Sequence, residues 1–123
     1  MKHLFRLVLF CIIMSVFACA SNKEADLPKA PVACDTTNMS YATNIAPLFQ
    51  NNKCLDCHSA QTATAGIILD NYAEASSNAE RVLPAISWGP NLPSGKKMPV
   101  GGPQVSSCEI EQFSAWINQG KKP

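Results

Sequence analysis

Two thiols and an imidazole lie within five consecutive residues, from Cys54 through Cys57 to His58. The pattern Cys-x-x-Cys-His is typical of the covalent attachment of c-type haem. Thiols one helical turn apart can reach the two vinyl groups on one edge of a porphyrin, and the adjacent imidazole then lies below the iron. We therefore expect Cys54 and Cys57 to bind one haem c, and His58 to be the proximal iron ligand.

Paired cysteines also occur in redox-active disulfides and in zinc sites. A redox-active pair follows a strand in an α/β fold and needs no histidine, whereas zinc needs four ligands at matching spacing. The sequence contains two histidines, and His3 belongs to an N-terminal segment that we expect to be removed. Haem attachment is therefore the better-supported interpretation, with a zinc site and a redox disulfide as the alternatives.

With one histidine left in the mature chain, the second axial ligand of the iron must be a methionine, a weak ligand or nothing. Met39 precedes the first expected helix, and Met98 lies in a segment rich in proline and glycine. Lys97 and Pro99 flank Met98, so no helical periodicity would bury it. Because methionine is an axial ligand of haem iron in electron-transfer proteins, we favour Met98 as the distal ligand. Met39 or an open site are the alternatives.

Three helices are expected to position these residues. The first spans residues 41–52, has Thr43 or Asn44 as its N-cap and leads directly into the cysteine pair. The second spans residues 71–83, with Asp70 as its N-cap. Its predicted inner face consists of Tyr72, Ala75, Ala79, Val82 and Leu83.

The third helix has the clearest start. Ser106 and Glu109 form a capping box, Val105 and Ile110 fit a hydrophobic staple, and Gly120 ends the helix. The spacing of its apolar residues predicts one buried stripe. This stripe consists of Ile110, Phe113, Trp116 and Ile117.

Residues 84–105 contain five prolines and four glycines, which predicts a long irregular loop. Loops of this length in a small domain are usually functional. The sequence shows no convincing pair of strands and no internal repeat. It therefore predicts an all-α fold of three helices with a long Pro/Gly loop.

Residues 1–18 have the pattern of a lipoprotein signal peptide. A short basic start precedes an apolar run over residues 7–17, which is too short to span a bilayer. The run ends in a lipobox-like segment, so we expect Cys19 to be lipidated and to become the new N-terminus. An ordinary signal peptide cut near Ala18 or Ala20 is the alternative. Residues 19–33 are then a flexible tether, and residues 34–123 form the domain.

Length and charge exclude several classes of protein. A chain of 123 residues has room for one domain of ordinary size, which excludes a multi-domain enzyme. The formal net charge is +1 for the whole chain, and it becomes −1 once residues 1–18 and their two basic residues are removed. No basic stripe is available to neutralise phosphates, so we expect no nucleic-acid partner.

Residues 41–120 resemble the monohaem class I c-type cytochromes, in particular small exported bacterial domains with a helix, a Cys-x-x-Cys-His segment, a short helix, a methionine loop and a final helix. In that family an aromatic residue before the first haem cysteine packs on an aromatic residue of the last helix. Phe49 and either Phe113 or Trp116 occupy these places. The resemblance implies a three-helix cytochrome c fold wrapped around the haem.

The resemblance also implies a function. It indicates a monomeric electron carrier, not an enzyme, that exchanges electrons with redox protein partners. The lipid anchor would hold it to a membrane in the periplasm or at the cell surface. A sensor that binds a gas or peroxide at an open distal site, and a relay subunit of a larger oxidoreductase, are the alternatives.

Two further cysteines receive a role from the same resemblance. Class I cytochromes bring their first and last helices together, which would place Cys34 near Cys108. An exported protein meets the oxidising conditions that a disulfide needs. We therefore expect these two residues to form a disulfide bond, with two free thiols as the alternative.

Overall fold

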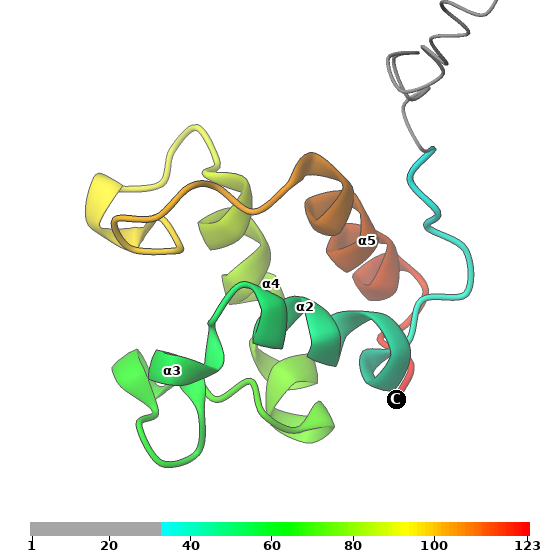
Figure 1. The fold of residues 1–123 in the computed structure, drawn as a ribbon, viewed down its shortest axis with the longest axis horizontal. Helices are drawn as coiled ribbons and strands as arrows, with labels where there is room; N and C mark the ends of the chain where they lie inside the picture. The colour runs from blue at the N-terminus through cyan, green and yellow to red at the C-terminus, as the bar shows by residue number, and fades with distance from the viewer. Residues whose placement is uncertain (1–32) are drawn as a thin grey trace, which may run out of the picture. The chain divides into compact units, whose positions relative to one another are not determined.

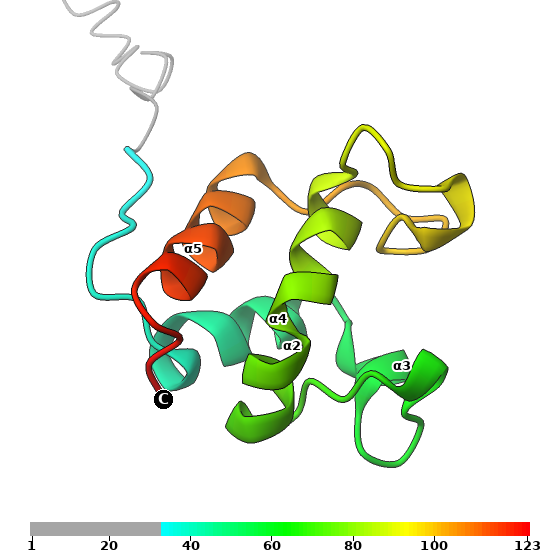
Figure 2. The same ribbon diagram turned by 180° about the vertical axis from the view of Figure 1, so that it is seen from behind.

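The computed structural model describes residues 33–123, which form helices and loops with no strand among them (Figures 1 and 2). The prediction of an all-α fold is confirmed for this part of the chain, but it contains four α-helices and not the three expected, because the residues after Cys54 form the short helix α3 (Leu55–His58). The expected signal segment, Cys19 and the tether up to residue 32 lie outside the described residues. Within residues 33–123 no helix combines the length and the apolar character that crossing a membrane requires. The elements in chain order are η2 (Tyr41–Ile45), α2 (Ala46–Asn51), α3 (Leu55–His58), η3 (Thr64–Gly66), α4 (Tyr72–Ser87), η4 (Ser94–Lys96) and α5 (Ser107–Asn118).

The first helix begins one turn earlier than its predicted N-cap. The Ser40 side chain accepts a hydrogen bond from the backbone N–H of Thr43 at 3.2 Å, so Ser40 is the N-cap and Thr43 lies inside the helix. The predicted caps Thr43 and Asn44 were therefore wrong. The helix starts as the π-helical turn η2 and continues as α2, with Pro47 in the first turn of α2, where its missing N–H costs little.

The second predicted helix, α4, is longer than expected and has a different cap. Asn71 caps it by accepting from Glu74 N–H at 3.0 Å. Asp70, the predicted cap, instead accepts from Ala60 N–H at 2.7 Å. The helix continues past Leu83 through Pro84, because the backbone N–H groups of Trp88 and Gly89 both bond to the Pro84 carbonyl.

The last helix, α5, has the predicted ends. Ser106 and Glu109 form the expected capping box, with Glu109 N–H at 3.3 Å from the Ser106 hydroxyl. Gly120 follows the helix with a φ of +88°, a conformation that favours glycine. The Glu109 carboxylate also accepts from the Asn52 side chain at 2.8 Å, which connects the start of α5 to the end of α2.

The buried core lies where α5 packs against α4 and η2. Phe49 and Phe113 meet edge-on with their ring centroids 5.8 Å apart, and Phe113 lies 5.6 Å from Trp116. Phe113 is therefore the partner of Phe49 in the helix contact that the sequence suggested. The inner face of α4 differs from the prediction, since Tyr72 is 37% exposed and Ile86 is buried. The buried hydrophobic residues are Met39, Ile45, Leu48, Phe49, Leu69, Ala75, Ala79, Val82, Ile86, Val105, Phe113 and Trp116.

Residues 34–39, which we call the strap, run along α5 (Figures 1 and 2). A disulfide joins Cys34 to Cys108 in the first turn of α5, with the two Cα atoms 5.4 Å apart. Further along, Gln112 donates to the Asp35 carbonyl at 3.1 Å, and Gln119 accepts from Met39 N–H at 2.8 Å. The disulfide joins the two cysteines that the resemblance to class I cytochromes led us to expect.

Candidate functional site

The cysteine pair is brought into place by the way α2 ends. Lys53 adopts a left-handed conformation with a φ of +56°. Cys54 N–H bonds to the Phe49 carbonyl at 2.9 Å, and Lys53 N–H bonds to the Gln50 carbonyl at 3.1 Å. This is the Schellman pattern of helix ends, here with lysine where glycine is more usual. It ties Cys54 directly to the buried Phe49 and starts α3 immediately after α2.

Cys54 and Cys57 are both unpaired thiols in the described structure, not a disulfide with each other. They lie one helical turn apart, with Cys57 N–H bonded to the Cys54 carbonyl at 3.3 Å. Cys54 is half-buried and Cys57 is exposed. Burial raises the pKa of the Cys54 thiol to about 11, with smaller contributions from Glu109 and Asp56. Cys54 is therefore a neutral thiol at pH 7.

The His58 side chain is only 9% exposed, and its ring nitrogens have different surroundings. Nδ1 lies 3.3 Å from the Ile67 carbonyl oxygen. A carbonyl only accepts hydrogen bonds, so Nδ1 is the nitrogen that carries the proton in the neutral imidazole, and Nε2 is the one with the lone pair. Nε2 has no hydrogen-bond partner among the described residues. Every fully buried side-chain nitrogen of these residues does have a partner, so Nε2 is not fully buried and is accessible to a ligand.

The loop over residues 59–70 holds the histidine in this orientation. Leu69 N–H bonds to the His58 carbonyl at 2.8 Å, and the Leu69 carbonyl accepts from the Tyr41 hydroxyl at 2.9 Å. The bond between Ala60 and Asp70 closes the same loop at its ends. The loop over residues 59–70 thus holds both the backbone and the ring of His58, and the Tyr41 hydroxyl connects this loop to η2.

Met98 is held by its backbone at the C-terminal end of α4. Its N–H donates to the Ala85 carbonyl at 3.0 Å, and its own carbonyl accepts from the indole nitrogen of Trp88 at 2.8 Å. The carbonyls in the last turn of a helix have no partners within the helix, and here Met98 supplies one. The Met98 side chain is partly buried and packs against the core.

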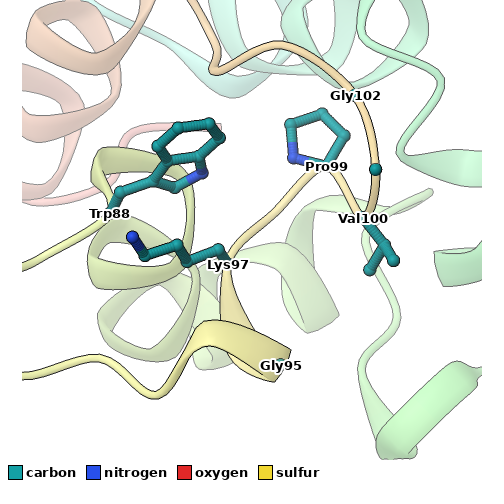
Figure 3. Close-up of a pocket in the computed structure, with 7 residues that line it drawn as sticks. Trp88, Gly95, Lys97, Pro99, Val100 and Gly102 are labelled. Atoms are coloured by element: carbon teal, nitrogen blue, oxygen red, sulfur yellow. The ribbon is translucent and has the colours of Figure 1, made fainter.

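The loop around Met98 also lines an open pocket of about 350 Å³, together with Trp88 (Figure 3). Trp88, in a left-handed conformation with a φ of +53°, forms one wall, and Pro99 and Val100 lie across from it. The Lys97 amine reaches over the Trp88 ring at 5.3 Å from its centroid. This cation–π contact restrains the side chain of Lys97, the residue that precedes Met98.

Met39, the other candidate ligand, lies in the core and is 2% exposed. It precedes η2, whereas His58 follows the end of α2. In the sequence, η2 and α2 therefore lie between Met39 and the segment that carries His58.

Both views place α3 and the loop over residues 88–105 at the end of the described domain away from the C-terminus (Figures 1 and 2). Of the residues predicted to bind haem, Cys57 and His58 belong to α3, Cys54 is the N-cap of α3, and Met98 belongs to the loop. In contrast, nowhere in residues 33–123 do three His, Cys, Asp or Glu side chains gather as a metal-binding group. The residues that could hold a cofactor here are thus two thiols, one imidazole and one thioether.

Two residues of this site were missed from the sequence. The Ile67 carbonyl that sets the histidine tautomer has no sequence signal, because any residue can supply a carbonyl. Trp88 could have been found, because Gly89 and Pro90 follow it and mark the end of a helix. No family model, no curated protein and no solved structure gives a significant match to this chain.

Proposed function

We propose that the protein is an exported monohaem cytochrome c of the class I type, which carries single electrons between membrane-associated redox partners and is not an enzyme. The observation that carries the proposal is the state of His58. Its Nδ1 lies 3.3 Å from the Ile67 carbonyl oxygen, which in the neutral imidazole places the proton on Nδ1 and leaves the Nε2 lone pair free. Metal-binding histidines almost always donate their other ring N–H in this way.

Each residue of the site then has a defined task. Cys54 and Cys57 would hold the haem covalently, His58 would be the proximal ligand, and Met98 the distal ligand. When bound, the haem supplies a one-electron redox couple. The Ile67 carbonyl orients the imidazole and increases its basicity. Ala85 and Trp88 fix the backbone of Met98.

The choice of Met98 as distal ligand has a functional consequence. A methionine ligand raises the reduction potential of a haem relative to a second histidine. A carrier of this kind suits the passage of electrons toward a terminal acceptor. In the proposed arrangement a lipid on Cys19 and the tether over residues 19–33 keep the domain, a monomer, at the membrane in the periplasm or at the cell surface.

The two alternatives for the cysteine pair receive less support. A redox-active pair follows a strand in an α/β fold, whereas Cys54 follows α2 and residues 33–123 contain no strand. A structural zinc ion needs four ligands, and residues 33–123 do not assemble even three of the usual kind.

The decisive experiment compares two double variants after expression with haem maturation enzymes. In acid acetone, haem should stay on the unmodified polypeptide and on Cys34→Ser/Cys108→Ser. It should be extracted completely from Cys54→Ala/Cys57→Ala. Haem that is extracted freely from the unmodified protein would contradict the proposal. Optical spectra then separate a carrier, with six-coordinate low-spin iron, from a sensor, with five-coordinate high-spin iron.

A further inference from the structure

The Glu109 carboxylate makes hydrogen bonds with both of its oxygens. Oε2 completes the capping box of α5, because it accepts from the Ser106 hydroxyl at 2.6 Å and from the Ser106 N–H at 3.3 Å. Oε1 accepts from the side-chain amide of Asn52 at 2.8 Å. A capping box needs only the bonds to the N-cap residue, so the cap does not explain the bond from Asn52.

Asn52 connects this carboxylate to the proposed haem site. Its side-chain amide has two hydrogens, and both are used, since it donates to Glu109 and, at 2.9 Å, to the Leu48 carbonyl. The backbone carbonyl oxygen of Asn52 lies 3.9 Å from the Cys54 sulfur. One residue thus contacts the Glu109 carboxylate with its side chain and the Cys54 sulfur with its backbone.

The charge of Glu109 is less exposed to water than the other charge of α5. Glu109 is half-buried, whereas Glu111 is exposed, and solvent screens an exposed charge more strongly than a partly buried one. Burial of the Cys54 thiol is the main cause of its raised pKa, and the Glu109 carboxylate adds to that increase. The electric field of Glu109 therefore reaches the sulfur to which a haem would be attached.

We propose that Glu109, held by Ser106 and Asn52 beside the attachment point at Cys54, lowers the reduction potential of the haem through its negative charge. The proposal rests on the proposed haem. Ferric haem takes up one electron from a redox partner and becomes ferrous, so its charge falls by one unit. A fixed negative charge nearby opposes this change by Coulomb repulsion. Glu109 would thus act against Met98, the ligand that raises the potential.

Glu109→Gln removes the charge and keeps the fit. Glutamine also serves at the third position of a capping box, and its amide oxygen still accepts from Asn52. In redox titrations of the holoprotein, this variant should have a higher reduction potential, by at least three times the change in Glu111→Gln. Glu111→Gln is the matched control, because it removes the same charge from an exposed residue of the same helix.

Glu109→Asp does the reverse, since it keeps the charge and shortens the side chain. It disturbs the bonds to Ser106 and Asn52 more than glutamine does, yet it should change the potential by less than a third of the Glu109→Gln change. A merely structural role of Glu109 predicts the opposite order of the two variants. A potential that changes more in Glu109→Asp than in Glu109→Gln would therefore overturn the inference.

Acid-acetone treatment of the same samples separates this inference from the proposed function. If the haem stays attached and Glu109→Gln changes the potential no more than Glu111→Gln, the role of Glu109 alone is overturned. Haem that is extracted from the unmodified protein overturns both proposals. Melting curves and the methionine-to-iron charge-transfer band show whether each variant keeps the fold and the Met98 ligand. Loss of that band in Glu109→Gln would also overturn the inference, because it requires that the charge be removed without loss of a ligand.

Discussion

The two ends of the described domain are stabilised in different ways. Where α5, η2 and α2 meet, aromatic rings interlock, and Phe49, Phe113 and Trp116 have no exposed surface. The end that carries α3 and the Met98 loop has no fully buried hydrophobic side chain in residues 50–68 or 87–104. Instead, backbone hydrogen bonds fix its His58 and Met98. Each fully buried large side chain stabilises the folded state by about 1.5–3 kcal/mol. The end with α5, η2 and α2 is therefore stable through its own core, whereas we expect the end with α3 and the Met98 loop to depend on a bound group.

The strongest test of this contrast replaces one large side chain at each end. Trp116→Ala should lower the free energy of unfolding by about 3–5 kcal/mol, because it creates a cavity in the core, and it also removes a hydrogen bond to the Lys122 carbonyl. Val100→Ala should change it by less than about 0.5 kcal/mol, because Val100 is 77% exposed. Urea titrations measure both. A Val100→Ala cost as large as that of Trp116→Ala would refute the contrast.

The two methionines test the same contrast at the iron. Met39→Ala should cost about 2–5 kcal/mol of stability, because Met39 is buried in the core, and it should leave the haem spectrum unchanged. Met98→Ala should abolish the methionine-to-iron charge-transfer band, create high-spin iron and lower the reduction potential. Optical spectra and redox titration distinguish the two results. If Met39→Ala produced the changes at the iron, the assignment of Met98 would be wrong.

Removal of the disulfide tests how much the strap contributes to the stability of the end that contains α5, η2 and α2. The bond joins residues 74 apart in sequence, for which chain entropy gives about 4 kcal/mol. Ligation of His58 and Met98 to one haem would already restrict part of the same loop, which reduces the gain to about 2–3 kcal/mol. Cys34→Ser/Cys108→Ser should therefore fold and bind haem but melt lower. The loss of stability should be larger when Met98→Ala is also present.

The smallest expected effect concerns the cap of α5. Ser106→Ala should cost about 1 kcal/mol, because it removes the acceptor for Glu109 N–H. Ser107→Ala is the matched control. Ser107 is the first residue of α5 and is exposed, so its replacement by a better helix former should be neutral or slightly stabilising. Thermal melts of the two single variants suffice, and equal melting temperatures would contradict the capping argument.

The sequence predicted those elements that depend on neighbouring residues. The capping box at Ser106 lies within four residues and was predicted correctly. The cap of α4 was misassigned because Asp70 and Asn71 are both good capping residues, and a contact with the distant Ala60 decides which of them caps the helix. The extension of α4 past Pro84 was missed for a similar reason, since proline usually marks the end of a helix.

For the site, the sequence identified the chemical groups but not what holds them. The spacing of Cys54, Cys57 and His58 is local, and α3 places the two thiols one turn apart as expected. The tautomer of His58 depends on a carbonyl nine residues away. The placement of Met98 depends on Ala85 and Trp88, the latter in a left-handed conformation that sequence rules rarely assign to tryptophan.

The strap along α5 also determines how the domain responds to mechanical force. A pull on the chain that precedes residue 34 enters the domain at the disulfide and passes covalently into the first turn of α5. The hydrogen bonds of Asp35 and Met39, which lie beyond Cys34, carry little of that load. The disulfide thus protects the segment between Cys34 and Cys108 from tension applied at its N-terminal side. This segment contains α3 and the Met98 loop.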